Sequence, residues 1–427
     1  MARRNLYWLI AVAVVSLICY QKVQNNRYGR IVADAMNQVQ RRYLEPVEPS
    51  DLFDGAMAGM ISRLDDPYSE YISAKLLPEF TEVLDREFGG LGMQVSQDPK
   101  TGQLTVASPL VGTPAYRAGI RAGDAILRID DQSTQGLSLP EAVKRMRGKV
   151  GDPVTVTVLH EGEEKPVEIK IVREIIRVDS VLGDTRHADG SWNFFLEGHD
   201  RIGYLRINTF AKETVEELTR TLRWLTAHEM RALVLDLRDN PGGLLSAAIE
   251  TCDLFIDSGT IVTTRGRDRQ QIRQVYTATG RGTFLSFPMA VIVNRFSASA
   301  SEIVAACLQD HHRAVIVGQR TLGKGTVQDL IGLEDGQGAL KLTTASYWRP
   351  SGKNIHKGKQ AGEDDEWGVT PDEGYRMIVE GEALTKLKLQ RLQRDVYKRA
   401  GSETEPFADP QLAKAVEYLD QQLQKKK

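Results

Sequence analysis

The sequence predicts an α/β protein with a parallel central sheet, and two observations support that class. Between residues 200 and 350, short apolar runs alternate with amphipathic helical patterns, an order that is typical of parallel sheets. Three of the apolar runs end in loops that are rich in glycine or serine. The strand candidates are residues 202–210, 232–237, 290–293 and 314–317, and helical stripes lie between them at 215–225 and 245–256.

Composition restricts the possible classes of protein. At ~150 residues per domain, the 427 residues suggest about three domains. Apolar residues make up 41% and charged residues 26%, which excludes a disordered chain, a collagen repeat and a protein that crosses a membrane many times. The formal net charge of −2 argues against a dedicated nucleic-acid binder. The three cysteines form no CxxC or His/Cys cluster, so we expect neither a zinc ribbon nor a disulfide scaffold, and no cofactor.

The N-terminus predicts a membrane-targeting segment. Arg3 and Arg4 precede residues 6–20, which carry no charge, as in a signal sequence. The run is shorter than the ~17–25 residues of a usual span, but no A-x-A cleavage site follows, and Cys19 lacks the small preceding residue of a lipoprotein signal. We expect an uncleaved signal anchor with both arginines inside; a cleaved signal peptide is the alternative. Either way, the bulk of the chain faces the periplasm or the cell exterior.

Helical patterns flank the predicted core. Residues 30–83 show helical spacing, with a second helix from Asp51 to Ser62, and the chain beyond residue 380 is helical and charged. A homo-oligomer through these helical termini is a further expectation. The predicted segments are a signal anchor (1–24), an N-terminal helical region (25–85), a glycine-rich module (86–176), the α/β core (177–375) and a C-terminal helical region (376–427).

The glycine-rich module carries a candidate peptide-binding loop. Gly89, Gly90 and Gly92 stand at the entry to a strand, together with Leu91 and Met93. Successive backbone N–H groups in such a loop can converge on a peptide carboxylate, although a plain hairpin turn is the commoner meaning of Gly-Gly. The strand that follows would pair with an extended peptide, and Leu91 and Met93 would offer apolar contact.

The three loops of the core carry the chemistry. They are residues 238–243, 294–302 and 319–328. Ligands in open α/β sheets bind beyond the carboxyl ends of the strands. If the strands are parallel neighbours, the loops meet and bring together a serine, a lysine and backbone donors, which is a complete set for acyl transfer.

Three serines compete for the nucleophile position. Ser297, Ser299 and Ser301 lie where an apolar helical stripe begins. Ser299 with Glu302 fits the capping box S-x-x-E, so a structural N-cap is the plainer interpretation of these two residues. The functional interpretation is that a serine at a helix N-terminus lies beside unpaired N–H groups that stabilise an oxyanion.

The donors to that oxyanion are backbone groups. The Ala300 N–H would be one, because it follows Ser299 at the helix start. Either Gly242 or Gly243 would supply the other, since glycine lets the backbone approach closely.

A general base is also required. His311 and His312 lie about twelve residues along the predicted helix, or ~18 Å from its start, so we expect them to be solvated helix-end residues. Lys324 lies in a glycine-rich loop, and a buried lysine loses its proton readily. It can then act as the base for a serine. Gln328 would hold the lysine amine with its amide oxygen.

Several segments resemble the carboxyl-terminal processing, or tail-specific, proteases. The core segments are NRFSASASEI (294–303), GKGTVQ (323–328) and DLRDNPGG (236–243), and GAMAGM (55–60) with LDDPY (64–68) resembles the N-terminal region of the family. The glycine loop, PAYRAGIRAGD (114–124) and ILRIDD (126–131) together resemble a PDZ domain. The resemblance covers roughly residues 30–375.

The resemblance implies specific roles. Ser299 would be the nucleophile, Lys324 the general base and Gln328 its orienting partner, in a crotonase-like α/β protease core preceded by the PDZ domain. The substrates would be proteins with flexible, apolar C-termini, which the PDZ domain captures. Residues 356–367 look longer and more charged than the family pattern.

Two alternatives stay open at the level of sequence. GQRTLGK (318–324) follows a strand and matches the P-loop pattern of nucleotide hydrolases, but Gly325 stands where Ser or Thr should hold magnesium, and residues 326–331 suggest a strand. A non-catalytic PDZ scaffold is the other alternative. A disulfide between Cys252 and Cys307 is left undecided.

Overall fold

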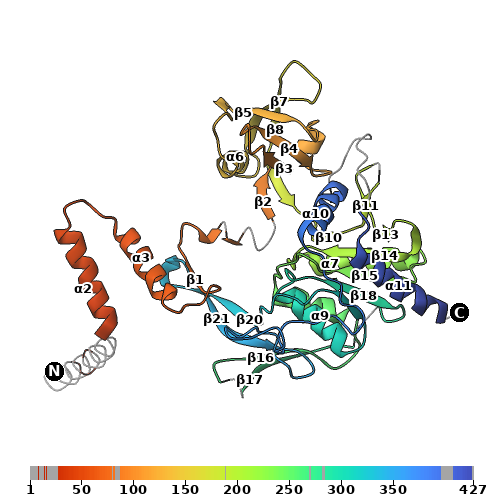
Figure 1. Ribbon diagram of the computed structural model, residues 1–427. Coiled ribbons are helices and arrows are strands. Elements are labelled where there is room, and N and C mark those ends of the chain that lie inside the picture. Colours follow the sequence, from red (N-terminus) through yellow and green to blue (C-terminus); the bar gives the residue numbers. More distant parts are fainter. Residues whose placement is uncertain are drawn as a thin grey trace. The chain divides into compact units, whose positions relative to one another are not determined.

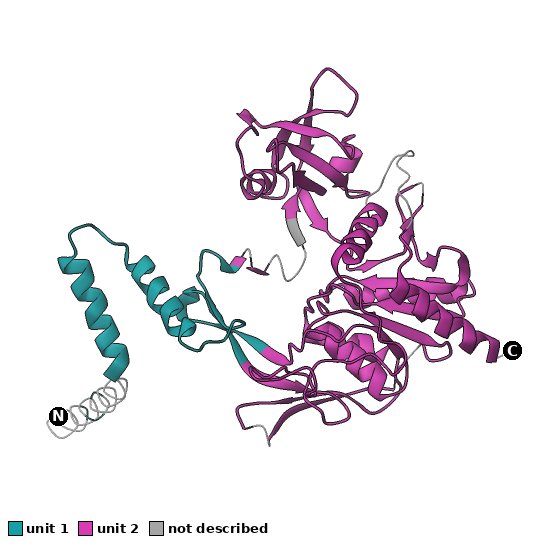
Figure 2. Cartoon of the chain, in the orientation of Figure 1, with its two compact units in different colours: residues 1–77, 328–343 teal, residues 78–327, 344–427 magenta. Residues whose placement is uncertain are grey.

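The computed structural model describes residues 8, 14, 16, 27–78, 80–81, 87–187, 189–268, 271–280, 284–395 and 407–425. The chain forms two compact units (Figure 2): residues 1–77 with 328–343, and residues 78–327 with 344–427. Among the described residues, no helix is long and apolar enough to cross a membrane. The predicted signal anchor falls almost entirely outside the described residues.

The first unit is mostly helical. It contains helices α2 (Arg27–Arg42) and α3 (Pro49–Ser62), strand β1 (Glu70–Ile72), most of strand β20 (Thr326–Gly332), helical turn η1 (Glu334–Gly336) and half of strand β21 (Ala339–Trp348). The helical expectation for residues 30–83 is wrong at β1, which pairs antiparallel with β21. That pairing partner lies far along the chain, so local periodicity gives no sign of it.

A β-rich module occupies residues 87–177 of the second unit. Its main sheet has the order β3-β4-β5-β7-β8, with β6 paired to β5, and β2 pairs separately with β9. The elements are β2 (Glu87–Gly90), β3 (Met93–Gln97), β4 (Leu104–Pro109), α5 (Pro114–Arg117), β5 (Ala125–Ile129), β6 (Gln132–Ser133), α6 (Leu139–Met146), β7 (Pro153–Leu159), β8 (Val167–Val172) and β9 (Glu174–Arg177). Buried aliphatic side chains from the sheet and both helices form a separate core.

The central sheet of the second unit confirms the predicted parallel order. Strands β14 (His199–Ile207), β15 (Ala232–Asp236), β18 (Met289–Val293) and β19 (Val315–Gly318) lie side by side and are parallel. Every residue of β15 and β18 is buried, because helices cover both faces of the sheet. The short strands β10 (Val181–Leu182) and β13 (Phe195–Leu196) extend it, and β11 (Thr185–Arg186) pairs with β12 (Trp192–Asn193).

Helices from distant parts of the chain form the two covering layers (Figure 1). One face packs against α7 (Thr214–Ala227), α8 (Leu245–Asp253) and α9 (Ala300–Asp310), and the other against α11 (Pro410–Lys425). Helix α10 (Gly381–Asp395) precedes α11. Part of the predicted C-terminal helical region is therefore a layer of the core, because the apolar stripe of α11 covers an apolar sheet face.

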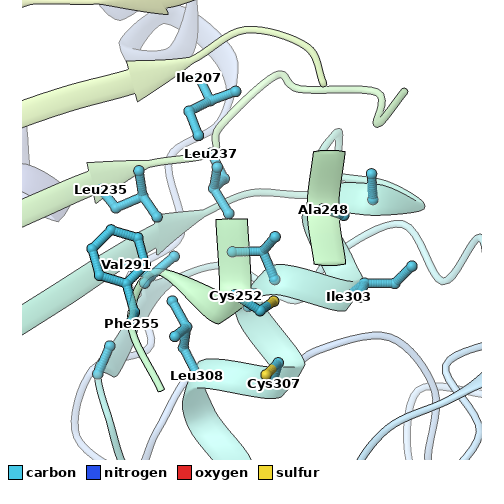
Figure 3. Packing of buried hydrophobic residues seen from close by; sticks show 14 of the residues in the cluster. Ile207, Leu235, Leu237, Ala248, Cys252, Phe255, Val291, Ile303, Cys307 and Leu308 are labelled. Carbon is cyan, nitrogen blue, oxygen red and sulfur yellow. The ribbon is translucent and has the colours of Figure 1, made fainter. Parts of the chain in front are cut away.

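Beside this sheet, β16 (Thr260–Arg265) pairs with β17 (Ile272–Thr277) and with the end of β21. The core under helices α8 and α9 is apolar and includes two cysteines (Figure 3). Cys252 of α8 and Cys307 of α9 are both buried free thiols. Burial raises the pKa of Cys252, and hydrogen bonding to Cys307 adds to the rise, so both behave as small apolar residues.

Candidate active site

Three loops meet at the carboxyl edge of the central sheet. They follow β15, β18 and β19, which are adjacent parallel strands. The loop after β18 contacts both of the others: Ala298 donates its N–H to the Asn240 carbonyl at 3.0 Å, and Leu322 donates to the Ser297 carbonyl at 3.0 Å. The convergence that the strand order predicts is therefore present.

Ser299 has a strained backbone at the start of α9. Its φ of 55° and ψ of −113° lie in a region that non-glycine residues rarely adopt. The residue is buried, with 8% of its surface exposed. The neighbouring serines have structural partners, because Ser297 Oγ donates to the Leu237 carbonyl and Ser301 Oγ to the Asn240 carbonyl. Ser299 is therefore the serine whose backbone carries strain, which is common at functional sites.

Glu302 links the serine loop to the lysine loop. Its Oε2 accepts the backbone N–H of Ser299 at 2.8 Å and that of Lys324 at 2.9 Å. Its Oε1 accepts the Gly323 N–H at 2.6 Å and the Thr321 hydroxyl at 2.5 Å. The carboxyl group is completely buried, and burial raises its pKa to about 7 although these four donors oppose the rise. The capping interpretation accounts for one of these bonds and misses the three to the lysine loop.

The two candidate glycines differ in what their N–H groups do. The Gly242 N–H donates to Asn240 Oδ1 at 2.8 Å. Among the described residues, no acceptor is found for the N–H of Gly243 or Ala300. Gly242 nevertheless has to be glycine, because its φ is +108° and an added Cβ would lie 2.8 Å from the Ser299 Cβ. The arrangement therefore offers Ala300 and Gly243, rather than Gly242, as backbone donors.

Lys324 belongs to the second unit and Gln328 to the first. Lys324 is half-buried in the loop before β20. Gln328 is half-buried within β20, and its Nε2 donates to Thr343 Oγ1 at 3.1 Å. Its predicted contact with the lysine amine stays a prediction.

The charged segment 356–367 packs over the lysine loop. Lys357 donates its N–H to the Gly323 carbonyl at 2.8 Å. The Trp367 ring lies against Gly323, where an added Cβ would come within 2.9 Å of it. The cations of Lys357 and Arg320 lie 4.0 and 4.5 Å from the centre of that ring. The segment that departs from the family pattern is thus part of the support of the Lys324 loop.

Two sequence interpretations are corrected here. His311 lies at the end of α9 as expected, but it is half-buried and its Nε2 lies 2.8 Å from the Thr260 carbonyl, so it is not solvated; His312 is exposed. Strand β20 begins two residues after Lys324, at Thr326, whereas a P-loop opens a helix. The nucleotide-hydrolase alternative is therefore wrong.

The comparisons with known proteins fit this geometry. Residues 201–374 match Peptidase family S41, residues 82–159 match the PDZ domain, and residues 20–76 match the activating protease CtpB N-terminal domain. The chain is 39% identical to a carboxy-terminal-processing protease of Bartonella bacilliformis over 82% of this chain and 76% of that protein. It is 36% identical to a carboxyl-terminal-processing protease of Picosynechococcus over 80% of this chain and 79% of that protein.

The chain belongs to the carboxy-terminal-processing protease family. It is a serine peptidase with a PDZ domain, so a non-catalytic scaffold is excluded. Among solved structures, a putative S41 protease from Bacteroides fragilis shares the fold with a TM-score of 0.51, 16% identity, and coverage of 91% of this chain and 96% of that one. The predicted α/β protease core with a PDZ domain is therefore confirmed.

In this family member, the candidate peptide-binding loop joins β2 to β3. Among the described residues, no acceptor is found for the N–H groups of Leu91 and Gly92. Gly92 has a φ of +76° and lies against Thr113, where an added Cβ would come within 2.3 Å. The Leu91 side chain packs in the core of the domain and Met93 is half-buried. Gly89 and Gly90 belong to β2, which pairs with β9.

Proposed function

We propose that this protease is a membrane-anchored, extracytoplasmic serine endopeptidase that cleaves near the C-terminus of its protein substrates, with Ser299 as nucleophile and Lys324 as base. The observation that carries the proposal is that Glu302 Oε2 accepts two hydrogen bonds, one from the backbone N–H of Ser299 and one from that of Lys324. One buried carboxylate thereby fixes the two loops that would hold the reacting groups.

The chemistry follows from that pairing. A neutral Lys324 amine takes the Ser299 hydroxyl proton while Oγ bonds to the carbonyl carbon of the scissile peptide. The carbonyl oxygen becomes an oxyanion and accepts the N–H groups of Ala300 and Gly243. When the carbon–nitrogen bond breaks, the protonated lysine returns the proton to the leaving amine. Water then hydrolyses the acyl-enzyme by the same base, and Gln328 orients the amine throughout.

The PDZ domain would select the substrate. The N–H groups of Leu91 and Gly92 are suited to a terminal carboxylate, and β3 would pair with the extended tail. Flexible tails fit this role because they can adopt the strand conformation that pairing requires.

The location rests on sequence alone. Arg3, Arg4 and the uncharged residues 6–20 support an anchor that leaves the protease domain outside the cytoplasm. Helix α2 has no buried residue and exposes Tyr28, Ile31 and Val32, which supports self-association through the N-terminal region. Fractionation of cells and analytical ultracentrifugation of the detergent-solubilised chain test these two points.

One experiment tests the activity and the nucleophile together. A folded test protein with a flexible apolar tail is incubated with wild type and with Ser299→Ala, and the products are read by mass spectrometry. We expect wild type to shorten the tail and Ser299→Ala to leave it intact, with Ser297→Ala and Ser301→Ala retaining more activity. Cleavage by Ser299→Ala at the wild-type rate would rule out Ser299.

A further inference from the structure

An arginine of the C-terminal helical region reaches the loop that follows β15. Arg391 of α10 bonds to the buried Asp236 carboxylate at 2.5 Å and to Asp239 Oδ2 at 3.0 Å. Its side chain is 12% exposed, so the guanidinium lies inside the protein. A planar guanidinium that bridges two carboxylates holds them at a fixed separation and also compensates their negative charges.

Asp236 is already part of a buried network at the end of β15. Its carboxylate accepts the backbone N–H, Nε and Nη2 of Arg238 and the Tyr204 hydroxyl. Although burial raises the pKa of Asp236, the charges of Arg238 and then Arg391 lower it below its ordinary value. Arg238 in turn bonds to Asp409 and Gln411 at the start of α11. Both C-terminal helices therefore hold the first residues of this loop.

Asp239 connects this network to the serine loop through hydrogen bonds. It has a φ of 59°, a conformation that a non-glycine residue keeps only when its surroundings hold it. Its N–H donates to Asn294 Oδ1 at 3.0 Å, and Asn294 Nδ2 donates back to Asp239 Oδ1 at 3.1 Å. The next residue, Asn240, accepts the Ala298 N–H with its carbonyl. A movement of Asp239 would thus shift both the residue before Ser299 and the Gly242–Gly243 turn.

We propose that Arg391 is a positioning residue for catalysis: by bridging Asp236 and Asp239, it holds loop 238–243 and the Ser299 loop in their reactive arrangement. Helix α10 then contributes to catalysis through the position of these two loops. The inference rests on the proposed role of Ser299 and adds to it a residue outside the matched S41 segment 201–374.

Helix α10 offers a matched control. Arg394, one turn further on, bonds to Asp184 Oδ1 at 2.5 Å and to Glu197 at 3.3 Å, and no described contact of Arg394 reaches loop 238–243. Arg391→Ala and Arg394→Ala each remove from the same helix one arginine that bonds to two acidic residues. The side chain of Arg391 is 12% exposed and that of Arg394 is 32% exposed, so a purely structural role of Arg391 predicts that each variant loses activity only to the extent that it loses stability.

The experiment measures kcat and KM on a tailed peptide and the midpoint of thermal unfolding. It also measures the rate at which a fluorophosphonate, which reacts with an activated serine, labels the full-length chain. We expect Arg391→Ala to lower kcat and the labelling rate about tenfold to a hundredfold, with KM within about twofold. Arg394→Ala should keep kcat close to the wild-type value. Millimolar guanidinium should restore part of the kcat of Arg391→Ala and leave Arg394→Ala unchanged. Equal kcat in the two variants would overturn the inference.

A second pair covers the case in which Arg391→Ala does not fold. Asp239→Asn keeps the oxygen that faces Asn294 but loses the charge that faces Arg391, and Asp184→Asn does the same to the partner of Arg394. We expect a loss of kcat in the first variant alone, and equal rates would again overturn the inference. Ser299→Ala is assayed alongside. Cleavage by Ser299→Ala would rule out the proposed nucleophile and this inference with it. If Ser299→Ala is inactive but the two variants of each pair have equal kcat, only this inference is wrong.

Discussion

Lys324 and Glu302 are joined by a hydrogen bond of 2.9 Å from the lysine backbone N–H to Glu302 Oε2. The same oxygen accepts the Ser299 N–H at 2.8 Å. The loop with the proposed base and the loop with the proposed nucleophile therefore share one acceptor atom. Because this atom is buried, the bonds do not compete with water and hold both backbones strongly.

Replacing Glu302 by Gln tests this link. A carboxylate accepts hydrogen bonds on both oxygens, whereas the glutamine amide accepts on one oxygen only. Depending on the orientation of the amide, its NH₂ faces either two backbone N–H groups or one hydroxyl and one N–H group. We expect the free energy of unfolding to fall by about 1–3 kcal/mol and kcat to fall about tenfold or more. Chemical denaturation and peptide kinetics measure the two effects.

The control for this change is another capping box. Glu141 Oε2 accepts the Ser138 N–H at 2.9 Å at the start of α6, and Glu141 is exposed in the PDZ domain. Glu141→Gln should reduce stability less than Glu302→Gln does and leave kcat at the wild-type value. An unchanged kcat in Glu302→Gln as well would show that the shared acceptor has no catalytic importance.

Stability and activity should respond to pH in opposite directions through Glu302. Its pKa is raised from 4.5 to about 7 in the folded chain, so the folded state binds more protons than the unfolded state between those values. The contribution of Glu302 to the free energy of unfolding therefore falls as pH rises from about 4.5 to about 7. Activity should rise over the upper part of that range, because only the ionised carboxylate accepts all four bonds.

The measurement compares wild type with Glu302→Gln, which cannot titrate there. Urea denaturation and kcat are recorded at several values from pH 5 to about 8. The difference in unfolding free energy between the two chains should change with pH, and the step in kcat should be absent from the variant. A constant difference would mean that the Glu302 pKa is not raised.

The sequence predicts the meeting of the three loops but not the network that holds them. Apolar runs such as 290–293 indicate strands buried on both faces, and parallel neighbours place their loops at one edge. Periodicity carries no information about Arg391, which lies 152 residues from Asp239 in the sequence and contacts it through a charged side-chain hydrogen bond. The choice between Gly242 and Gly243 depends on the Asn240 side chain, and no spacing rule gives its direction.

The strained backbone of Ser299 predicts a conflict between stability and activity. At a φ of 55° and a ψ of −113°, glycine is relaxed and alanine is not. Ser299→Gly should therefore unfold with a free energy about 1–2 kcal/mol higher than that of Ser299→Ala, while both are inactive. Thermal and urea denaturation of the two variants decide the point. A less stable glycine variant would mean that the observed backbone carries no strain.

The lysine is tested by removing its ability to lose a proton. An arginine keeps the positive charge at any useful pH and cannot accept the serine proton. Lys324→Arg should be inactive in single-turnover cleavage from roughly pH 6 to 10, where wild type gains activity as the amine loses its proton. Gln328→Ala should lower kcat more than it raises KM, since Gln328 is proposed to orient the amine and not the peptide.

A base other than Lys324 would appear as activity in the arginine variant. His356 is the matched control, because its backbone packs against Gly325, the residue after Lys324. His356→Ala should retain most of the wild-type rate. Cleavage by Lys324→Arg together with its loss in His356→Ala would transfer the role of base to the histidine.

The carboxylate-binding role of the PDZ domain gives the last prediction. The N–H groups of Leu91 and Gly92 have no acceptor among the described residues, and two amide donors suit a terminal carboxylate. A substrate with an amidated C-terminus should therefore be cleaved with a lower kcat/KM than the free acid, mainly through a higher KM. Gly92→Ala should weaken the preference, because the added methyl group would clash with Thr113 at a φ of +76°. Kinetics of the acid and the amide with wild type and Gly92→Ala measure both effects. Equal kcat/KM for acid and amide in wild type would show that the domain does not bind the carboxylate, whatever the loop variant does.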